Sequence, residues 1–298
     1  MSSNVNMPTR REFARLSALT LAGAGSSLIV AGCGSTASSS SDDSGSTGGS
    51  SDSGSSRTLR IGMEAAYAPY NWQTDTESDY TIPIEGLDGA YADGYDVQIA
   101  KSVAKTLGRE PIAVKLAWDG LIDAVKNGTI DLIIAGMTAT PEREESIDFT
   151  DAYFVETYGL LVRKDSSYAD ATSLSDFSGA AVIGQKDTIY DEIIDDIPDV
   201  NHLTPAASVP AVISAVNNGT ADAGTYSQQT TDAVLRSNTD LTNVNFADGE
   251  GFTEESECNI GLAKGQDDLL NQLNDALSQI SDDERDEMWQ GACDRQPA

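Results

Sequence analysis

Short β-rich runs alternate with amphipathic helical stretches from residue 58 onward, and this alternation restricts the fold more than any other feature of the sequence. It is typical of an α/β fold with largely parallel strands. The predicted strands are Thr58–Gly62, Ala113–Leu116, Asp131–Ala135, Gly159–Arg163, Ala180–Gly184, Ala221–Tyr226 and Asn259–Ala263.

Apolar residues recur at helical spacing between these strands. Ile99, Val103 and Leu107, for example, share one face of a helix that we expect to stop at Gly108. The predicted helices are Asp96–Leu107, Asp119–Asn127, Asp187–Asp195, Pro210–Asn217, Gln228–Ser237, Asp267–Ile280 and Asp283–Ala292.

One segment of the sequence is echoed later in the chain. Residues 124–131 read AVKNGTID and residues 215–222 read AVNNGTAD, so both combine a helix end, a glycine stop and a strand start. Two lobes of about 100 residues built on one plan would explain this. The alternative is coincidence, because helix-Asn-Gly-strand connections are common.

The chain is strongly acidic. It has 18 Lys and Arg residues against 48 Asp and Glu, a formal net charge of −30 with the single His neutral. Nucleic-acid binding needs a basic face, which this composition cannot supply. Because His202 is alone, a histidine-based catalytic triad or a multi-histidine metal site is also excluded. We expect no cofactor and no metal.

Residues 1–33 have the features of an export signal. Paired arginines, Arg10 and Arg11, precede Phe13 and an apolar run from Leu16 to Val30. The pair is similar to the twin-arginine export motif, and residues 30–33, VAGC, are similar to a lipobox, which predicts lipidation at Cys33. The alternative is a transmembrane anchor, for which the run falls short of about 20 residues. We expect a protein that is lipid-anchored to the outer face of the cell membrane.

Two further features of the sequence are interpreted in the light of export. Residues 34–57 are almost wholly Ser, Gly, Asp, Thr and Ala, which predicts a flexible tether with a reach of about 25 to 30 Å. Cys258 and Cys293 are an even pair in an exported chain, so we expect them to form a disulfide. The alternatives are two free thiols or a metal site, and neighbouring His residues are missing for the latter.

The most informative turn follows the predicted strand at 131–135. Thr140 is a suitable N-cap and Pro141 suits the first helical position, which places Arg143 in the first turn of a short helix. A cation near a helix N-terminus is electrostatically unfavourable unless an anion binds beside it. We therefore predict that Arg143 clamps a carboxylate, assisted by the Gly136 backbone and the Thr138 hydroxyl. The alternative is a surface arginine paired with a neighbouring glutamate.

Two other groups of residues could complete a cleft. The turn at 183–188, which includes Gln185 and Thr188, joins a strand to a helix start and could present N–H groups to the same anion. Tyr67 and Trp118 sit at strand ends, where aromatic rings could form apolar walls, with ordinary core packing as the alternative.

The core of the chain resembles the extracellular solute-binding proteins, family 3, which are receptors of polar amino acid ABC transporters. The likeness runs from about residue 59 to 289 and is most specific from Ile130 to Asp151. The supporting segments are Ile61-Gly62, Tyr67 to Tyr70, Gly94 to Asp96, Trp118 to Ile122, Gly219 to Ala223 and Asn259 to Lys264.

The resemblance implies a two-lobed, type II periplasmic-binding-protein-like fold with mixed, mostly parallel sheets and two hinge strands. Lobe 1 would comprise residues 58–155 and 254–298, and lobe 2 residues 156–253. It also implies a monomer that is not an enzyme and that delivers an amino acid to ABC-transporter permease subunits.

The resemblance also implies roles for single residues. Arg143 would bind the ligand α-carboxylate, Gly136 and Thr138 its carboxylate and amino group, and Thr188 the carboxylate from lobe 2. Tyr67 and Trp118 would stack on the ligand side chain.

The sequence departs from the family pattern at two positions. Ser227 stands where an aspartate for the ligand α-ammonium is expected, and Asp187 stands in place of a glycine. A zwitterion receptor needs an anion beside the ammonium, which Glu64 or Asp187 could supply. We predict a polar or cationic amino acid as ligand. The alternatives are an amine-free carboxylate, or a cyclohexadienyl-dehydratase-like enzyme in which Glu64 moves a proton.

Overall fold

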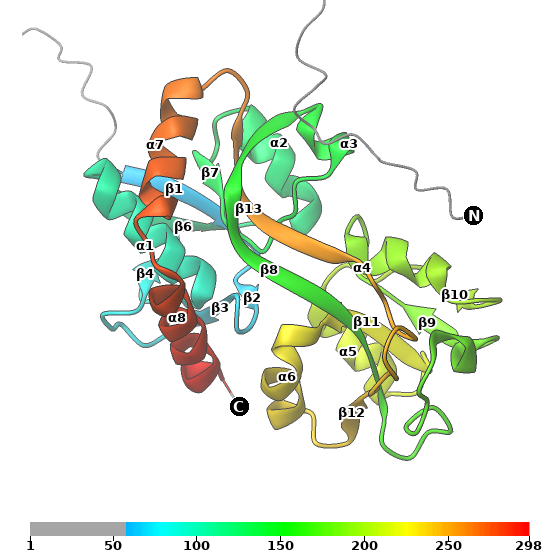
Figure 1. Cartoon of the computed structure of the whole chain (residues 1–298). Helices are drawn as coiled ribbons and strands as arrows, with labels where there is room; N and C mark the ends of the chain where they lie inside the picture. The colour runs from blue at the N-terminus through cyan, green and yellow to red at the C-terminus, as the bar shows by residue number, and fades with distance from the viewer. Residues whose placement is uncertain (1–57, 298) are drawn as a thin grey trace, which may run out of the picture. The chain divides into compact units, whose positions relative to one another are not determined.

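The structure is a computed structural model that describes residues 58–297 (Figure 1). The predicted signal at 1–33 with Cys33, and the predicted tether at 34–57, lie outside the described residues. No helix within residues 58–297 combines the length and the apolar character needed to cross a bilayer.

A nine-stranded mixed sheet runs through the described part of the chain in the order β10-β9-β11-β8-β13-β7-β1-β6, with β12 paired to β8 beside this path. Pairing is parallel between β1 and its neighbours and between β9 and its neighbours, and it is antiparallel around β8 and β13. The strands are β1 (Thr58–Met63), β6 (Glu110–Lys115), β7 (Leu132–Ile133), β8 (Ile147–Arg163), β9 (Ala181–Ile183), β10 (Asn201–His202), β11 (Ala223–Ser227), β12 (Leu241–Asn243) and β13 (Glu255–Ala263).

Strand β8 joins two lobes. Its first part pairs with β13 as far as Thr157, and its last part, from Tyr158, pairs with β11 and β12. Lobe 1 comprises the residues before β8, including β1, β6 and β7, together with the residues after β13, and lobe 2 comprises the residues between β8 and β13, including β9 to β12. Figure 1 shows β8 and β13 running side by side from one lobe toward the other. The predicted mixed α/β architecture with two lobes is confirmed.

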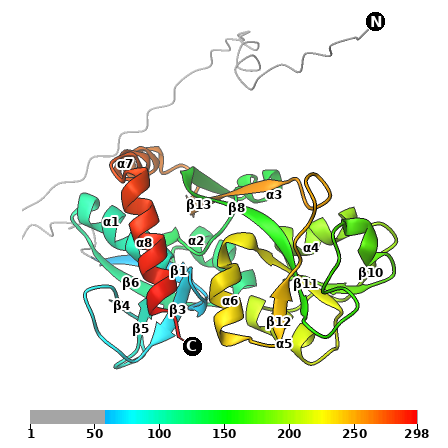
Figure 2. The same ribbon diagram turned by 60° about the horizontal axis from the view of Figure 1, so that its bottom comes forward.

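Helices cover the sheet in both lobes, and each predicted helix is present. Helix α1 ends where Gly108 adopts a φ of 66°, as the glycine predicts. Figure 2 shows α8 crossing lobe 1 in front of the sheet. The helices are α1 (Tyr95–Leu107), α2 (Leu121–Lys126), α3 (Pro141–Glu144), α4 (Ile189–Glu192), α5 (Val209–Asn217), α6 (Thr231–Ser237), α7 (Asp267–Ser278) and α8 (Asp282–Arg295), with 3₁₀ turns η1 (Trp118–Gly120), η2 (Leu174–Phe177), η3 (Ile193–Asp196) and η4 (Gln228–Thr230).

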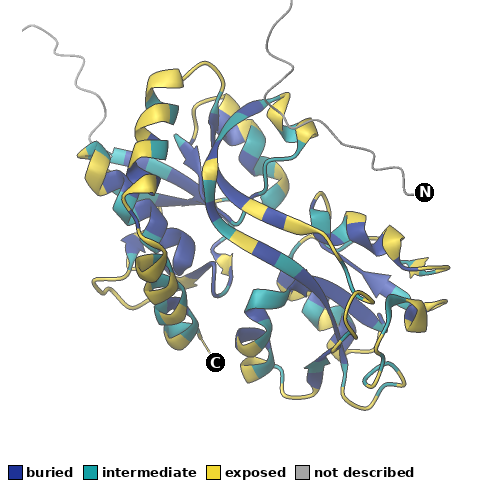
Figure 3. Cartoon of the chain, in the orientation of Figure 1, coloured by how far each residue is buried: buried dark blue, intermediate teal, exposed yellow. Residues whose placement is uncertain are grey.

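Apolar side chains between the sheet and the helices hold each lobe together. In lobe 1 the strand residues Leu59 and Ile61 and the helix residues Ile99 and Val103 are fully buried. Each such side chain contributes about 1.5 to 3 kcal/mol by leaving water. Figure 3 shows the result, with buried strands lying beneath helices whose outer faces are exposed.

A second, four-stranded antiparallel sheet was not predicted. It has the order β2-β3-β5-β4 and its strands are β2 (Ala66–Tyr67), β3 (Asn71–Thr74), β4 (Ile82–Pro83) and β5 (Tyr91–Asp93). Strands of two to four residues are too short to show a periodic pattern. The sheet closes tightly at Gly94, whose φ is 136° and where a Cβ would lie 2.2 Å from the Tyr70 carbonyl oxygen.

The predicted disulfide between Cys258 and Cys293 is wrong, because both residues are free cysteines. Cys258 is buried in β13, whereas Cys293 lies on α8, where its carbonyl accepts a hydrogen bond from Arg236. Disulfide formation requires a specific placement of both Cβ atoms. An even number of cysteines indicates only that a bond is chemically allowed in that compartment.

We therefore expect two thiols to titrate with Ellman's reagent in a chain carrying Cys33→Ser, unfolded in denaturant without reductant. In the folded protein Cys293 should react much faster than Cys258, because burial raises the pKa of the Cys258 thiol well above its ordinary value. If no thiol were detected after unfolding, Cys258 and Cys293 would have to be joined by a disulfide.

Candidate ligand site between the lobes

Eight of the ten predicted ligand-binding residues line one small cavity between the lobes. Its volume is about 20 Å³, enough for about one water molecule. Lobe 1, lobe 2 and the crossing strand β8 all contribute to its walls. The lining residues are Glu64, Tyr67, Trp118, Ala135, Gly136, Thr138, Arg143, Glu156, Gln185, Thr188, Ile189 and Tyr190.

Arg143 is held by the turn that the sequence predicted. Thr140 caps α3 by accepting a hydrogen bond from the Arg143 backbone N–H, and Pro141 begins the helix. The guanidinium group donates to the Thr138 carbonyl at 2.8 Å and, across the cavity, to the Asp187 carbonyl at 2.8 Å. Its Cζ atom lies 5.3 Å from the centre of the Trp118 ring. The guanidinium plane is therefore fixed at the cavity wall.

The Arg143 charge has no ion-pair partner in the part of the chain that the structure describes. Every salt bridge found among the described residues involves other side chains. Burial lowers its pKa, and the nearby carboxylate of Glu192 acts in the opposite direction. A desolvated cation without a counter-ion favours the binding of an anion.

Glu64 lies directly after β1. Its carboxylate is half-buried and accepts a long hydrogen bond of 3.4 Å from the Gln185 amide of lobe 2. Burial raises the pKa of Glu64, and the Gln185 amide partly opposes this rise. Glu64 is thus a second charge in the cavity with no partner of opposite sign in the described residues.

The remaining predicted turn residues use part of their hydrogen-bonding capacity within the protein. The Gly136 N–H donates to the Tyr153 hydroxyl at 2.9 Å, and the Thr188 hydroxyl donates to the Gln185 carbonyl at 2.7 Å. Gly136 adopts a φ of 63°, a backbone conformation that favours glycine. The Gly136 N–H is consequently not directed at the cavity, contrary to a role in anion binding.

Two predicted residues do not line the cavity. Asp187 contributes only its carbonyl, which accepts from Arg143 and from the Trp118 indole at 3.0 Å, while its half-exposed carboxylate lies 3.3 Å from Lys186. Ser227 is fully buried at the end of β11, behind the cavity wall. Asp187 is therefore not placed to supply the anion that Ser227 lacks.

A third charged group, Glu156 of β8, was not predicted. Its side chain is 3% exposed and accepts hydrogen bonds from the Tyr70 hydroxyl at 2.8 Å and the Tyr190 hydroxyl at 2.9 and 3.0 Å. The predicted strand began only at Gly159. A longer strand would have shown Glu156 in register with Tyr158 and Leu160, on the buried face, and its neighbour Val155 on the other.

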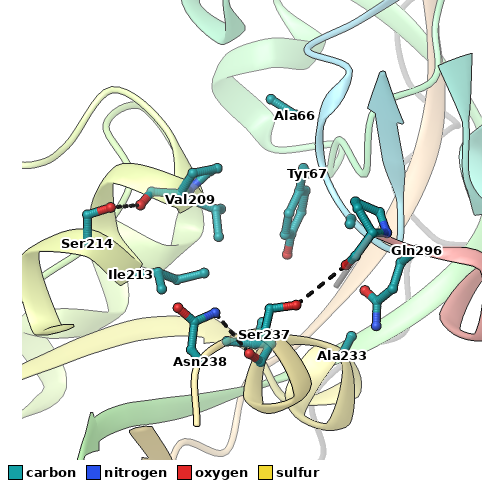
Figure 4. Close-up of a pocket in the computed structure, with 13 residues that line it drawn as sticks. Ala66, Tyr67, Val209, Ile213, Ser214, Ala233, Ser237, Asn238 and Gln296 are labelled. Carbon is teal, nitrogen blue, oxygen red and sulfur yellow. Dashed lines mark hydrogen bonds between the residues drawn. The ribbon is translucent and has the colours of Figure 1, made fainter. Parts of the chain in front are cut away.

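A larger cavity of about 330 Å³ lies nearby and also borders Tyr67 (Figure 4). Apolar side chains of α5, Val209 and Ile213, lie on one side of it and Gln296 lies on the other. The Gln296 Nε2 atom is buried and has no hydrogen-bond partner within residues 58–297. No charged side chain of the described residues lines this cavity, so it does not match a zwitterion.

Comparison with known proteins identifies the family. The family model for bacterial extracellular solute-binding proteins, family 3, matches residues 59–290. The chain belongs to this family. A relative, the arginine-binding extracellular protein ArtP of Bacillus subtilis (strain 168), is 29% identical over 209 residues, covering 70% of this chain and 79% of its own.

Solved structures of amino acid-binding proteins share the fold. The substrate binding protein of an amino acid ABC transporter has a TM-score of 0.66 and 26% identity, covering 78% of this chain and 96% of that chain. The ancestral amino acid-binding protein AncCDT-1, a precursor of cyclohexadienyl dehydratase, has a TM-score of 0.65 and 26% identity, with coverages of 79% and 95%. The predicted type II periplasmic-binding-protein-like fold is confirmed.

Proposed function

We propose that this protein is an extracytoplasmic receptor that captures a polar amino acid between its lobes and delivers it to the permease subunits of an ABC transporter. The observation that carries the proposal is the charge arrangement of the small cavity. One guanidinium and two carboxylates line it, and none of the three has an ion-pair partner among residues 58–297. A zwitterionic ligand would satisfy charges of both signs.

In this proposal Arg143 binds the α-carboxylate of the ligand. The ligand would take the place of the Asp187 carbonyl at the guanidinium, and the hydroxyl groups of Thr138 and Thr188, which line the same cavity, would add hydrogen bonds. Trp118, already stacked beside Arg143, would cover the side chain of the ligand together with Tyr67. No residue is assigned a catalytic role.

Capture requires the lobes to separate. A cavity of about 20 Å³ holds one water molecule, and an amino acid is far larger. We place the hinges where the pairing of β8 with β13 ends, at Thr157 and Glu255, so that residues 58–155 and 254–298 move against residues 156–253. Opening would break the hydrogen bonds that Arg143 and Trp118 make to Asp187.

Lipidation at Cys33 and a tether at 34–57 would hold this receptor as a monomer at the outer face of the membrane, near its permease. The expectation rests on the sequence motifs of residues 1–57. Metabolic labelling with palmitate should mark the wild-type chain and leave a Cys33→Ala variant unlabelled.

A thermal-shift panel tests the function. Ligand-stripped protein would be screened against the standard L-amino acids, several amine-free carboxylates, prephenate and arogenate. Saturation at about 1,000 times the dissociation constant adds about 4 kcal/mol, which should raise Tm by about 8 to 16 °C with one group of polar amino acids. A shift with amine-free carboxylates alone, or turnover of prephenate or arogenate, would replace the proposal with the alternative concerned.

Replacement of Trp118 by alanine should weaken binding moderately and change the ranking of side chains. The variant loses the ring that covers Arg143, a contact of about 0.5 to 2 kcal/mol, which corresponds to about a 3- to 30-fold loss of affinity. The ranking is measured by titrating the panel's best ligands into both proteins. An unchanged ranking would contradict the stacking role.

A further inference from the structure

Glu156 is the most completely buried charge in the ligand cavity. It lies on β8 between the two lobes and is contacted from both: Tyr70 belongs to lobe 1 and Tyr190 to lobe 2. Tyr190 in turn contacts the Tyr67 hydroxyl at 2.9 Å. Because Tyr190 donates its proton to the carboxylate, Tyr67 donates to Tyr190. The carboxylate thus accepts from a chain of phenols that spans the lobes.

Hydroxyl groups satisfy the lone pairs of Glu156 but do not neutralise its charge. No Lys, Arg or His side chain within residues 58–297 forms an ion pair with it. Burial raises the pKa of Glu156, and hydrogen bonds from Ser227, Tyr70 and Tyr190 oppose the rise. An ionised carboxylate in this position is costly unless a cation joins it.

The position of Glu156 explains the serine at 227. Ser227 ends β11 and pairs with Tyr158 of β8, so the neighbouring strand carries Glu156 two residues away. The Ser227 hydroxyl lies 3.4 Å from the Tyr70 hydroxyl, which itself donates to Glu156 at 2.8 Å. A carboxylate at 227 would compete with Glu156 for the same hydroxyl. Glu156, Tyr70 and Ser227 therefore form one hydrogen-bonded group beside the cavity.

We propose that Glu156 binds the α-ammonium group of the ligand, in place of an acidic residue at position 227. This inference rests on the proposed function. It leaves Glu64, which contacts Gln185 weakly and lines the same cavity, available to the ligand side chain. One guanidinium with two carboxylates complements a ligand of net charge +1, which is a cationic amino acid.

The stability of the unliganded protein distinguishes ligand binding by Glu156 from a purely structural role as a junction between the lobes. Between the pKa of an unfolded glutamate and its raised value in the fold, the folded state holds the extra proton, so stability falls as pH rises. Removing the charge should therefore leave the unliganded protein equally or more stable at neutral pH. If Glu156 instead held the lobes together, Glu156→Gln would destabilise the unliganded protein.

The test uses the full chain and three matched pairs of probes: L-arginine with 5-guanidinopentanoate, L-lysine with 6-aminohexanoate, and L-glutamine with 4-carbamoylbutanoate. In each pair only the amino acid has an α-amino group. Truncating one partner of a buried charge pair is costly, so Glu156→Gln should weaken calorimetric binding of the amino acid by about 100-fold or more. The amine-free probe should change by less than about threefold.

A carboxylate placed on the neighbouring strand should restore part of the lost affinity. The double variant Glu156→Gln/Ser227→Asp returns an anion to the Tyr70 hydroxyl from β11 and should recover at least about tenfold of the lost affinity. Glu257→Gln is the matched control, because Glu257 is an exposed residue of the neighbouring strand β13. It should bind every probe as the wild type does.

The outcomes separate this inference from the function on which it rests. Failure of the wild-type chain to bind any amino acid, these three and the rest of the thermal-shift panel included, would overturn the proposed function and this inference together. Normal binding by the wild type with unchanged affinity in Glu156→Gln would overturn the inference alone. Equal losses of affinity for the amino acid and its amine-free analogue, or a fall in the Tm of the unliganded variant of more than about 6 °C, would show that Glu156 has a structural role instead.

Discussion

Replacement of Arg143 by alanine is expected to abolish amino acid binding and leave the fold intact. Arg143 is the cation of the cavity, and it has no ion-pair partner in the described residues whose release could compensate for its loss. Removing one member of a desolvated pair costs about 3 to 5 kcal/mol, which corresponds to a loss of affinity of about 150- to 5,000-fold.

The effect is measured by calorimetric titration of the best ligand from the thermal-shift panel. Arg143→Lys should recover only part of the loss, because an ammonium cannot form the paired hydrogen bonds of a guanidinium. Lys126→Ala is the control, since Lys126 is an exposed cation of α2 that lies outside the cavity. Unchanged affinity in Arg143→Ala, with wild-type affinity in Lys126→Ala, would show that the carboxylate binds elsewhere.

Substitution of Glu64 by glutamine is expected to change which amino acids bind. Its carboxylate is half-buried, and the 3.4 Å contact with Gln185 is too long to satisfy it. If it faces a cationic side chain, Glu64→Gln should weaken binding of L-arginine and L-lysine by about 10- to 100-fold. L-Glutamine, whose side chain is neutral, should bind within about threefold of its wild-type affinity.

Competition among the three amino acids in one titration gives this selectivity directly. Glu110→Gln serves as a matched control, because Glu110 begins β6 on the surface and does not border the cavity. Parallel losses for charged and neutral ligands would show that Glu64 contacts the part that all amino acids share. In that case the ammonium, rather than the side chain, would be its partner.

Much of the fold could be predicted because its longer elements carry strong periodic signals. The α1 helix, with Ile99, Val103 and a stop at Gly108, is one example, and strand β1 is another. The four short strands between Ala66 and Asp93 could not be predicted, since each depends on pairing with the others. The free thiols of Cys258 and Cys293 show that pairing also depends on placement, which residue counts do not reveal.

A site residue could be predicted where the charge of a side chain was unfavourable at its expected place in the fold. Arg143 at a helix start is anomalous without an anion, and the structure places it in the cavity. Glu156 was missed because the predicted strand began at Gly159, so no strand pattern placed its side chain on a buried face. Only the full length of β8, with Val155 49% exposed and Glu156 buried, shows that the charge points inward. The shared hydroxyl of Tyr70 then links it to Ser227.

Calorimetric titration of ligand-stripped wild-type protein with L-arginine, agmatine and 5-guanidinopentanoate tests the central claim most directly. Agmatine lacks the carboxylate that Arg143 would bind, and 5-guanidinopentanoate lacks the ammonium that Glu156 would bind. We expect one L-arginine per chain and an affinity lower by about 100-fold or more for each truncated compound. Equal affinity for all three compounds, or no binding of L-arginine or any other amino acid, would contradict capture of a zwitterion between the lobes.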